Sequence, residues 1–193
     1  TVNSGASAGE WADAGGGADL YAANESSPTA QPSATGTNAV AIGNSAVASG
    51  ANSFSAGTNQ YNGGSIAGGA GAAALGGSYA SGANSFASAI ANNTSGYGAT
   101  GSSAVALGSQ ARATATQSLA LGKLASAIHT QAVAIGLSST AQHANAISIG
   151  NSVSSTANNQ ISLGGTADTV RISSTYTLPT ADGTANQVLT TDG

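Results

Sequence analysis

The fold is decided by residues 102–150, which read SSAVALGSQARATATQSLALGKLASAIHTQAVAIGLSSTAQHANAISIG. Within this stretch, pentapeptides of one kind end in glycine: AVALG at Gly108, SLALG at Gly122, AVAIG at Gly136 and AISIG at Gly150. Each glycine follows the previous one by 14 residues. A fixed period of this kind is the signature of a repeat architecture, in which each unit stacks on its neighbour.

The same unit extends in both directions from this stretch. Downstream, QISLG ends at Gly164, and upstream AVAIG ends at Gly43 and SFSAG at Gly57. Between them, AAALG ends at Gly76, and SFASA carries Ala89 at the matching position. From Gly43 to Gly108 the intervals run 14, 19, 13 and 19 residues, so two of these coils carry an excursion of about five extra residues.

The residue pattern inside each unit predicts two short strands. The positions three and one before the glycine are large and apolar, and the residue between them is Ala or Ser, as in Val133-Ala134-Ile135. This period of two is typical of a β-strand with two different faces. After the glycine, alanines such as Ala125 and Ala127 alternate with other residues and predict a second strand whose inward side accepts only small side chains. The large residues are expected to form a core ladder: Val40, Ile42, Val105, Leu107, Leu119, Leu121, Val133, Ile135, Ile147, Ile149, Ile161 and Leu163.

Two strands and two tight turns account for one 14-residue unit, so each unit is predicted to make one circuit and to stack on the next at about 4.8 Å. The expected fold is therefore all-β, a parallel β-roll of 14-residue coils over residues 38–164, about 45 Å long. So narrow a roll encloses one thin layer of side chains, and self-association is expected to cover the remaining apolar surface. The pattern does not decide which face of the first strand fills the roll and which meets a sister copy.

Composition excludes several classes of function. The 193 residues include 43 Ala, 29 Ser and 28 Gly, whereas Val, Ile, Leu and Phe together number 29. Lys and Arg together number three, too few to form a phosphate-binding surface, so nucleic acid is not an expected partner. No Cys is present for a disulfide or thiolate site, and no run approaches the roughly 20 apolar residues of a membrane span. Residues 26–167 hold no Asp or Glu, so the paired carboxylates of a glycosidase are absent and no enzyme is expected. No bound cofactor or metal is expected either.

Three units carry a resemblance to a known family. They read NAVAIGNSAVASGANSFSAG (38–57), SSAVALGSQARATATQSLALG (102–122) and QAVAIGLSSTAQHANAISIG (131–150). They resemble the YadA-like head repeat of trimeric autotransporter adhesins, which also occurs in bacteriophage tail fibre proteins. The resemblance implies a left-handed parallel β-roll wound as a homotrimeric rod. The implied partners are therefore other copies of the chain and neighbouring fibre or virion proteins.

The two ends of the chain lack the repeat. Residues 1–37 contain the only Trp, Trp11, and are interpreted as an N-terminal cap or linker. Residues 165–193 are predicted to be a C-terminal β segment that leads to a fibre end or to a removed domain. Their last part, YTLPTADGTANQVLTTDG (176–193), resembles a segment that precedes the C-terminal domain of phage fibre proteins and favours a virion fibre over a bacterial adhesin.

The excursions supply the candidates for receptor contact. Tyr61 lies in NQYNGG and Tyr97 in NTSGYGATG, and exposed Tyr among Asn, Ser and Gly is typical of adaptable contact surfaces for a host glycan or protein. The alternative is that both loops are tolerated insertions or contacts between chains. His129 and His143 lie 14 residues apart and could share a metal or anion site, but a ladder of solvent-facing turn residues is favoured.

We therefore expect a structural, non-enzymatic and extracellular fibre module that carries a host-attachment surface, on a virion as part of a phage tail fibre or on a similar appendage. The alternative is the head of a bacterial trimeric autotransporter adhesin, on a cell-surface appendage, that binds matrix or another cell.

Overall fold

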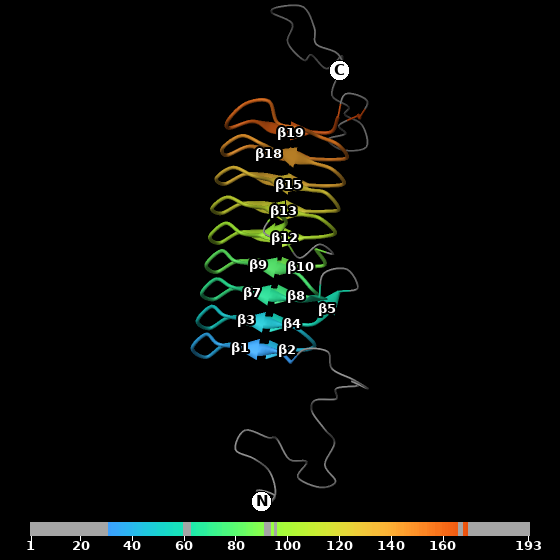
Figure 1. Ribbon diagram of the computed structural model, residues 1–193. Coiled ribbons are helices and arrows are strands. Elements are labelled where there is room, and N and C mark those ends of the chain that lie inside the picture. The colour runs from blue at the N-terminus through green and yellow to red at the C-terminus, as the bar shows by residue number, and fades with distance from the viewer. Residues whose placement is uncertain (1–30, 60–62, 91–93, 95, 166–167, 170–193) are drawn as a thin grey trace, which may run out of the picture.

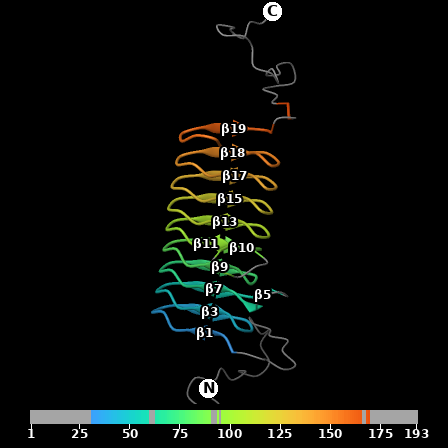
Figure 2. The same ribbon diagram turned by 45° about the horizontal axis from the view of Figure 1, so that its top comes forward.

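The described residues form a stack of coils that ascends in chain order (Figure 1). The computed structural model describes residues 31–59, 63–90, 94, 96–165 and 168–169. In the turned view, each coil is a flat loop with one strand on either side, and consecutive coils lie parallel (Figure 2). This is an all-β solenoid, as the sequence predicts, and no helix occurs among the described residues. Most of the predicted N-terminal cap and C-terminal segment, including Trp11 and residues 176–193, lies outside them.

Two parallel sheets make up the solenoid, and each coil contributes one strand to each sheet. The eight-stranded sheet contains β1 (Ser33–Ala34), β3 (Val47–Ala48), β7 (Ile66–Ala67), β9 (Tyr79–Ala80), β11 (Gly98–Ala99), β13 (Arg112–Ala113), β15 (Ser126–Ala127) and β17 (Thr140–Ala141). The nine-stranded sheet contains β2 (Val40–Ile42), β4 (Phe54–Ala56), β8 (Ala73–Leu75), β10 (Phe86–Ser88), β12 (Val105–Leu107), β14 (Leu119–Leu121), β16 (Val133–Ile135), β18 (Ile147–Ile149) and β19 (Ile161–Leu163). Because β1 already pairs with β3, the solenoid begins before residue 38.

The strand registers reproduce the alignment of the pentapeptides. Val105 pairs with Leu119, and Leu119 in turn pairs with Val133. Across the two excursions the register also holds, because Phe54 pairs with Ala73 and Phe86 with Val105. Extra residues therefore leave the ladder intact, since they lie between a strand of the nine-stranded sheet and the next strand of the eight-stranded sheet.

Each coil closes through residues with positive φ. The glycine that ends the pentapeptide has a φ of 118° at Gly108 and 129° at Gly122, a backbone conformation that side chains rarely adopt. The next turn positions are left-handed as well but are not glycine, for example Gln110 and Gln117, both with a φ of 58°. Glycine occupies the position after the first strand in most coils and Ala89 in one, whereas Asn, Gln and Ser supply most of the other left-handed positions.

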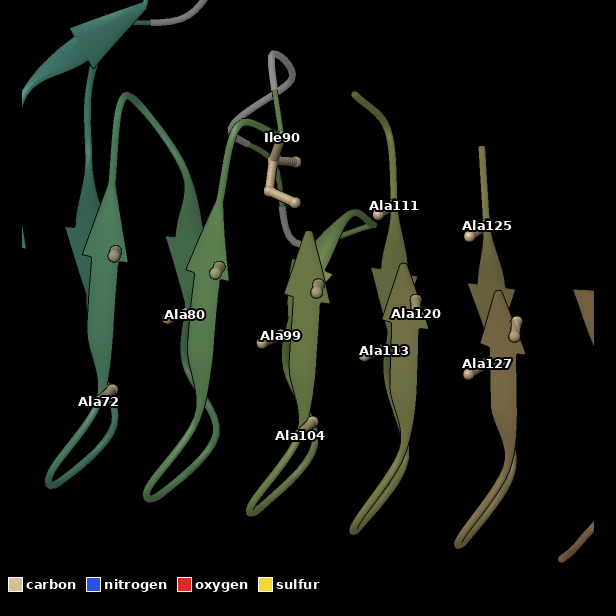
Figure 3. Packing of buried hydrophobic residues seen from close by; sticks show 14 of the residues in the cluster. Ala72, Ala80, Ile90, Ala99, Ala104, Ala111, Ala113, Ala120, Ala125 and Ala127 are labelled. Atoms are coloured by element: carbon tan, nitrogen blue, oxygen red, sulfur yellow. The ribbon is translucent and has the colours of Figure 1, made fainter. Parts of the chain in front are cut away.

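The interior of the roll is made almost entirely of alanine and serine. Figure 3 shows the buried alanines of successive coils together with Ile90. Ala113, Ala127 and Ala141 of the eight-stranded sheet are fully buried, which confirms that its inward side accepts small residues. From the nine-stranded sheet, Ala120 and Ala134 are fully buried as well. Methyl groups from the two sheets fill the narrow space between them, and Ile90 is the one large side chain among the described residues with no exposed surface.

The prediction of a core ladder is wrong in one respect: the ladder forms, but it is not the core of the roll. Its side chains flank the buried Ala or Ser at the centre of each strand, so strand alternation directs them outward. The physical reason is space, because an interior filled by alanine has no room for Val, Ile or Leu. We call these outward residues the outer ladder: Val40, Ile42, Val105, Leu107, Leu119, Leu121, Val133, Ile135, Ile147, Ile149, Ile161 and Leu163.

Candidate binding surfaces

The outer ladder gives the nine-stranded sheet an apolar outer face. Its members are half-buried or exposed, and the exposed fraction reaches 46% at Val40 and 64% at Ile161, at the two ends of the sheet. Phe54, at the equivalent position of β4, extends the face and is 39% exposed. No ladder position carries a charge. Monomeric soluble proteins rarely leave a continuous apolar face of this kind in water, so this face has the character of an interface.

The eight-stranded sheet presents a different outward surface. One residue of each strand points away from the buried alanines, and these residues stack in register. We call those from β3 to β17 the outer column: Val47, Ile66, Tyr79, Gly98, Arg112, Ser126 and Thr140. The column is apolar from Val47 to Ile66 and polar from Arg112 onward, and its character changes at Gly98, where a side chain is absent. A bound molecule would therefore meet both apolar and polar groups along it.

Tyr97 and Arg112 come together at this change. The Arg112 guanidinium carbon lies 6.0 Å from the centre of the Tyr97 ring, within the range of a cation–π interaction. The Tyr97 ring is half-buried and packs against the alanine core, whereas Arg112 is exposed. A backbone hydrogen bond from Tyr97 N to Thr94 O, 3.0 Å long, holds the segment that enters β11. Of the two predicted receptor contacts, Tyr97 therefore lies beside the outer column, next to Gly98, while Tyr61 lies outside the described residues.

Sequence reasoning missed Tyr79, which is half-buried in the same column. Ala80 pairs with Ala99, so Tyr79 is level with Gly98, and Gly98 pairs with Arg112 on the next strand. The 13- and 19-residue steps around β9 hide this relationship in the sequence, although aligning the units on their inward alanines reveals it. Arg112 thus lies two strands from Tyr79 with only a glycine between them.

The first excursion is tied to the roll by a short antiparallel pair. Its strands are β5 (Thr58–Asn59) and β6 (Gly63–Gly64), and they project beside the stack (Figure 1). Where the chain returns, the buried hydroxyl of Ser65 donates to Ala56 O at 2.9 Å and accepts from Gly77 N at 2.7 Å. The root of this loop is therefore fixed by hydrogen bonds to two neighbouring coils.

The two histidines occupy equivalent turn positions of adjacent coils. His129 is exposed, and His143 is half-buried with its Nδ1 3.2 Å from Ser155 Oγ. Within the described ranges, no group of three or more His, Asp or Glu residues gathers as a metal site would require. The same ranges hold no helix of the length and hydropathy needed to cross a bilayer.

The solenoid defines a class, that of parallel β-roll repeat modules. Comparison with protein families then identifies the repeat: the YadA head domain repeat matches residues 34–59, 99–125 and 130–152. The chain therefore carries YadA-like head repeats. Such repeats are typical of surface-exposed adhesins. A search of curated proteins finds no match.

Proposed function

We propose that this chain is a structural, non-enzymatic module of a homotrimeric extracellular fibre that carries or displays a host-attachment surface. Phage tail fibres and similar appendages are the proposed setting, and neighbouring fibre or virion proteins are the proposed partners besides the chain itself. One observation carries the proposal: the large apolar residues lie outside the roll. A chain that puts alanine inside and Val, Leu and Ile outside depends on a partner to keep those residues dry.

Identical copies are the simplest partner for the outer ladder. Its residues repeat along the sheet with the spacing of the strands, so a second copy side by side presents the same spacing of apolar groups. The absence of charge on the ladder removes the repulsion that would oppose self-association. The number three rests on the resemblance to trimeric autotransporter adhesins. With three copies, weak contacts on identical outward faces add through avidity.

The oligomeric state tests the structural part. One chain has a mass of 18.0 kDa, so native mass spectrometry is expected to give a species of about 54 kDa. The species is expected to persist on dilution, because an obligate interface of this kind has no stable folded monomer. A compact monomer of 18.0 kDa with intact β-structure would contradict the proposal.

The alternative setting is the head of a bacterial trimeric autotransporter adhesin that binds matrix or another cell, and the match to the YadA head repeat favours it. The two settings differ in what accompanies the module. Mass spectrometry of the intact particle or cell envelope distinguishes them, because a tail fibre is recovered with virion proteins, whereas an adhesin is recovered with a coiled-coil stalk and a membrane anchor in the same polypeptide. Attachment itself is tested by adding the purified module to host cells and measuring competition with the intact fibre.

A further inference from the structure

We propose that the part of the outer column formed by Tyr79, Gly98 and Arg112, together with Tyr97, binds a carboxylate-bearing sugar of an extracellular polysaccharide. This inference rests on the proposed attachment function and names the class of ligand for it. The site lies on the eight-stranded sheet, away from the outer ladder that self-association is proposed to cover.

Gly98 separates Tyr79 from Arg112 along the outer column and is itself buried. In the outer column it lies between Tyr79 on one neighbouring strand and Arg112 on the other. Its φ is 88°, and a Cβ built on it would collide with the carbonyl oxygen of Tyr79. No larger residue fits there without moving the backbone, so the fold keeps position 98 free of a side chain. Two strand spacings, about 10 Å, separate the backbone positions of Tyr79 and Arg112.

The charge of Arg112 specifies an anion. No Asp or Glu occurs between residues 26 and 167, so this guanidinium has no carboxylate on its own or any neighbouring coil. Among the described residues its one recorded side-chain interaction is with the Tyr97 ring. The Arg112 side chain is exposed to solvent beside this ring. A planar guanidinium of this kind matches a carboxylate through two parallel hydrogen bonds.

The two tyrosines and the polar end of the column specify a sugar. An aromatic ring with a hydroxyl at its tip offers an apolar face to the C–H groups of a pyranose and a hydrogen bond to its hydroxyls. Beyond Arg112, the column continues with Ser126 and Thr140, whose hydroxyls both donate and accept. An oligosaccharide laid along the column would meet rings, then the cation, then hydroxyls. Tyr97 and Tyr79 are both half-buried, so their side chains lose little conformational freedom when a ligand binds.

Binding of defined oligosaccharides tests this inference. The full chain is titrated with two acidic probes, a hyaluronan hexasaccharide with internal carboxylates and 3′-sialyllactose with a terminal one. Chitohexaose and lactose are the neutral controls. Calorimetry at low salt is expected to show at least about tenfold tighter binding of one acidic probe than of its neutral control. Whichever acidic probe binds identifies the position of the carboxylate that the site accepts.

Two variants and one control locate the effect. Arg112→Gln is expected to remove the preference for the acidic probe, and Arg112→Lys to keep only part of it, because an ammonium cannot form the paired hydrogen bonds. Lys123→Gln removes another exposed cation, on a turn outside the column, and is expected to leave the preference unchanged. Circular dichroism of all three variants verifies that the β-roll is intact.

Three results would overturn the inference: equal affinity for acidic and neutral probes, an acidic preference that survives Arg112→Gln, or an equal loss in Lys123→Gln. Cell attachment separates this inference from the proposed function. If the trimer attaches to cells equally well before and after enzymatic removal of acidic glycans, attachment stands and the sugar site fails, which leaves a protein receptor. If the chain is monomeric or does not attach, the proposed function itself fails.

Discussion

Leu119 and Val133 pair in register on neighbouring strands of the nine-stranded sheet, and both side chains lie outside the roll. The residues that follow them, Ala120 and Ala134, are fully buried inside. This is the reverse of the usual arrangement, in which large apolar residues fill the core. The roll is therefore closed by its backbone ladder and small side chains, while the large apolar residues of the outer ladder stay half-buried or exposed.

The first prediction concerns the outer ladder. Leu119→Lys is expected to dissociate the proposed trimer, because a charge buried without a partner in an apolar interface costs several kcal/mol. Native mass spectrometry of this variant should show species near 18.0 kDa in place of about 54 kDa. Ser126→Lys places the same side chain on the outward face of the opposite sheet and should leave the trimer intact. A trimer of Leu119→Lys as stable as the wild type would exclude the ladder as the interface.

The second prediction compares two neighbours on one strand. Ala127 and Ser126 form β15, but Ala127 is fully buried inside the roll and Ser126 faces outward. Ala127→Leu is expected to lower the free energy of unfolding by at least about 1–3 kcal/mol, since the alanine-lined interior has no space for three more carbon atoms. Ser126→Leu, of similar final size, should change it by less than about 0.5 kcal/mol. Thermal unfolding at equal chain concentration measures both.

A smaller effect of Ala127→Leu than of Ser126→Leu would mean that the inward and outward sides of the eight-stranded sheet are assigned in reverse. Concentration must be matched, because the melting temperature of an oligomer rises with the concentration of its chains.

The sequence predicts the periodic part of the fold well because backbone geometry controls it. The alternation Val133-Ala134-Ile135 predicts the strand, and the recurring glycines predict the turn and the register. They do not determine which face of the strand points into the roll, since a period of two is unchanged when the two faces are exchanged. The small residues of the second strand hold that information: if Ala125 and Ala127 line the roll, the opposite sheet must also contribute small residues.

The surface site was harder to predict than the roll. Tyr97 stands out in the sequence because it lies in an excursion, yet Tyr79 lies within a regular strand and its proximity to Arg112 depends on a 19-residue step across that excursion. The left-handed turn residues were also beyond the pattern. Gln110 and Leu124 have φ values of 58° and 61°. Their position in the coil imposes this left-handed conformation, which residues other than glycine rarely adopt.

The third prediction compares two glycines. Gly122 has a φ of 129°, and a Cβ there would lie 2.5 Å from the carbonyl oxygen of Gly136. Gly122→Ala is therefore expected to lower the free energy of unfolding by at least about 2 kcal/mol. Gly76 has a φ of 63° with nothing within 4 Å of such a Cβ, and Ala89 adopts a φ of 57° at the matching place of the next coil. Gly76→Ala should cost about 1 kcal/mol.

Chemical denaturation of both glycine variants measures the difference. If Gly122→Ala cost no more than Gly76→Ala, neither the larger φ nor the close Gly136 carbonyl would require glycine at position 122.

The fourth prediction concerns a buried hydroxyl. In the part of the chain that the structure describes, Ser85 Oγ is buried and has no hydrogen-bond partner. Its neighbours in the stack are Ala72 and Ala104, so alanine fits this position in the adjacent coils. Ser85→Ala is expected to raise the free energy of unfolding by up to about 1 kcal/mol, because an unpaired polar group no longer loses its water on folding.

Ser148→Ala is the matched control, since Ser148 is equally buried but its hydroxyl donates to Thr140 O at 3.0 Å. Removing it deletes a hydrogen bond between the two sheets and should lower the free energy of unfolding by about 1 kcal/mol. The two serine variants should therefore shift the melting temperature in opposite directions. A loss of stability in Ser85→Ala comparable to that in Ser148→Ala would show that the Ser85 hydroxyl has a partner in solution, such as a bound water molecule inside the roll.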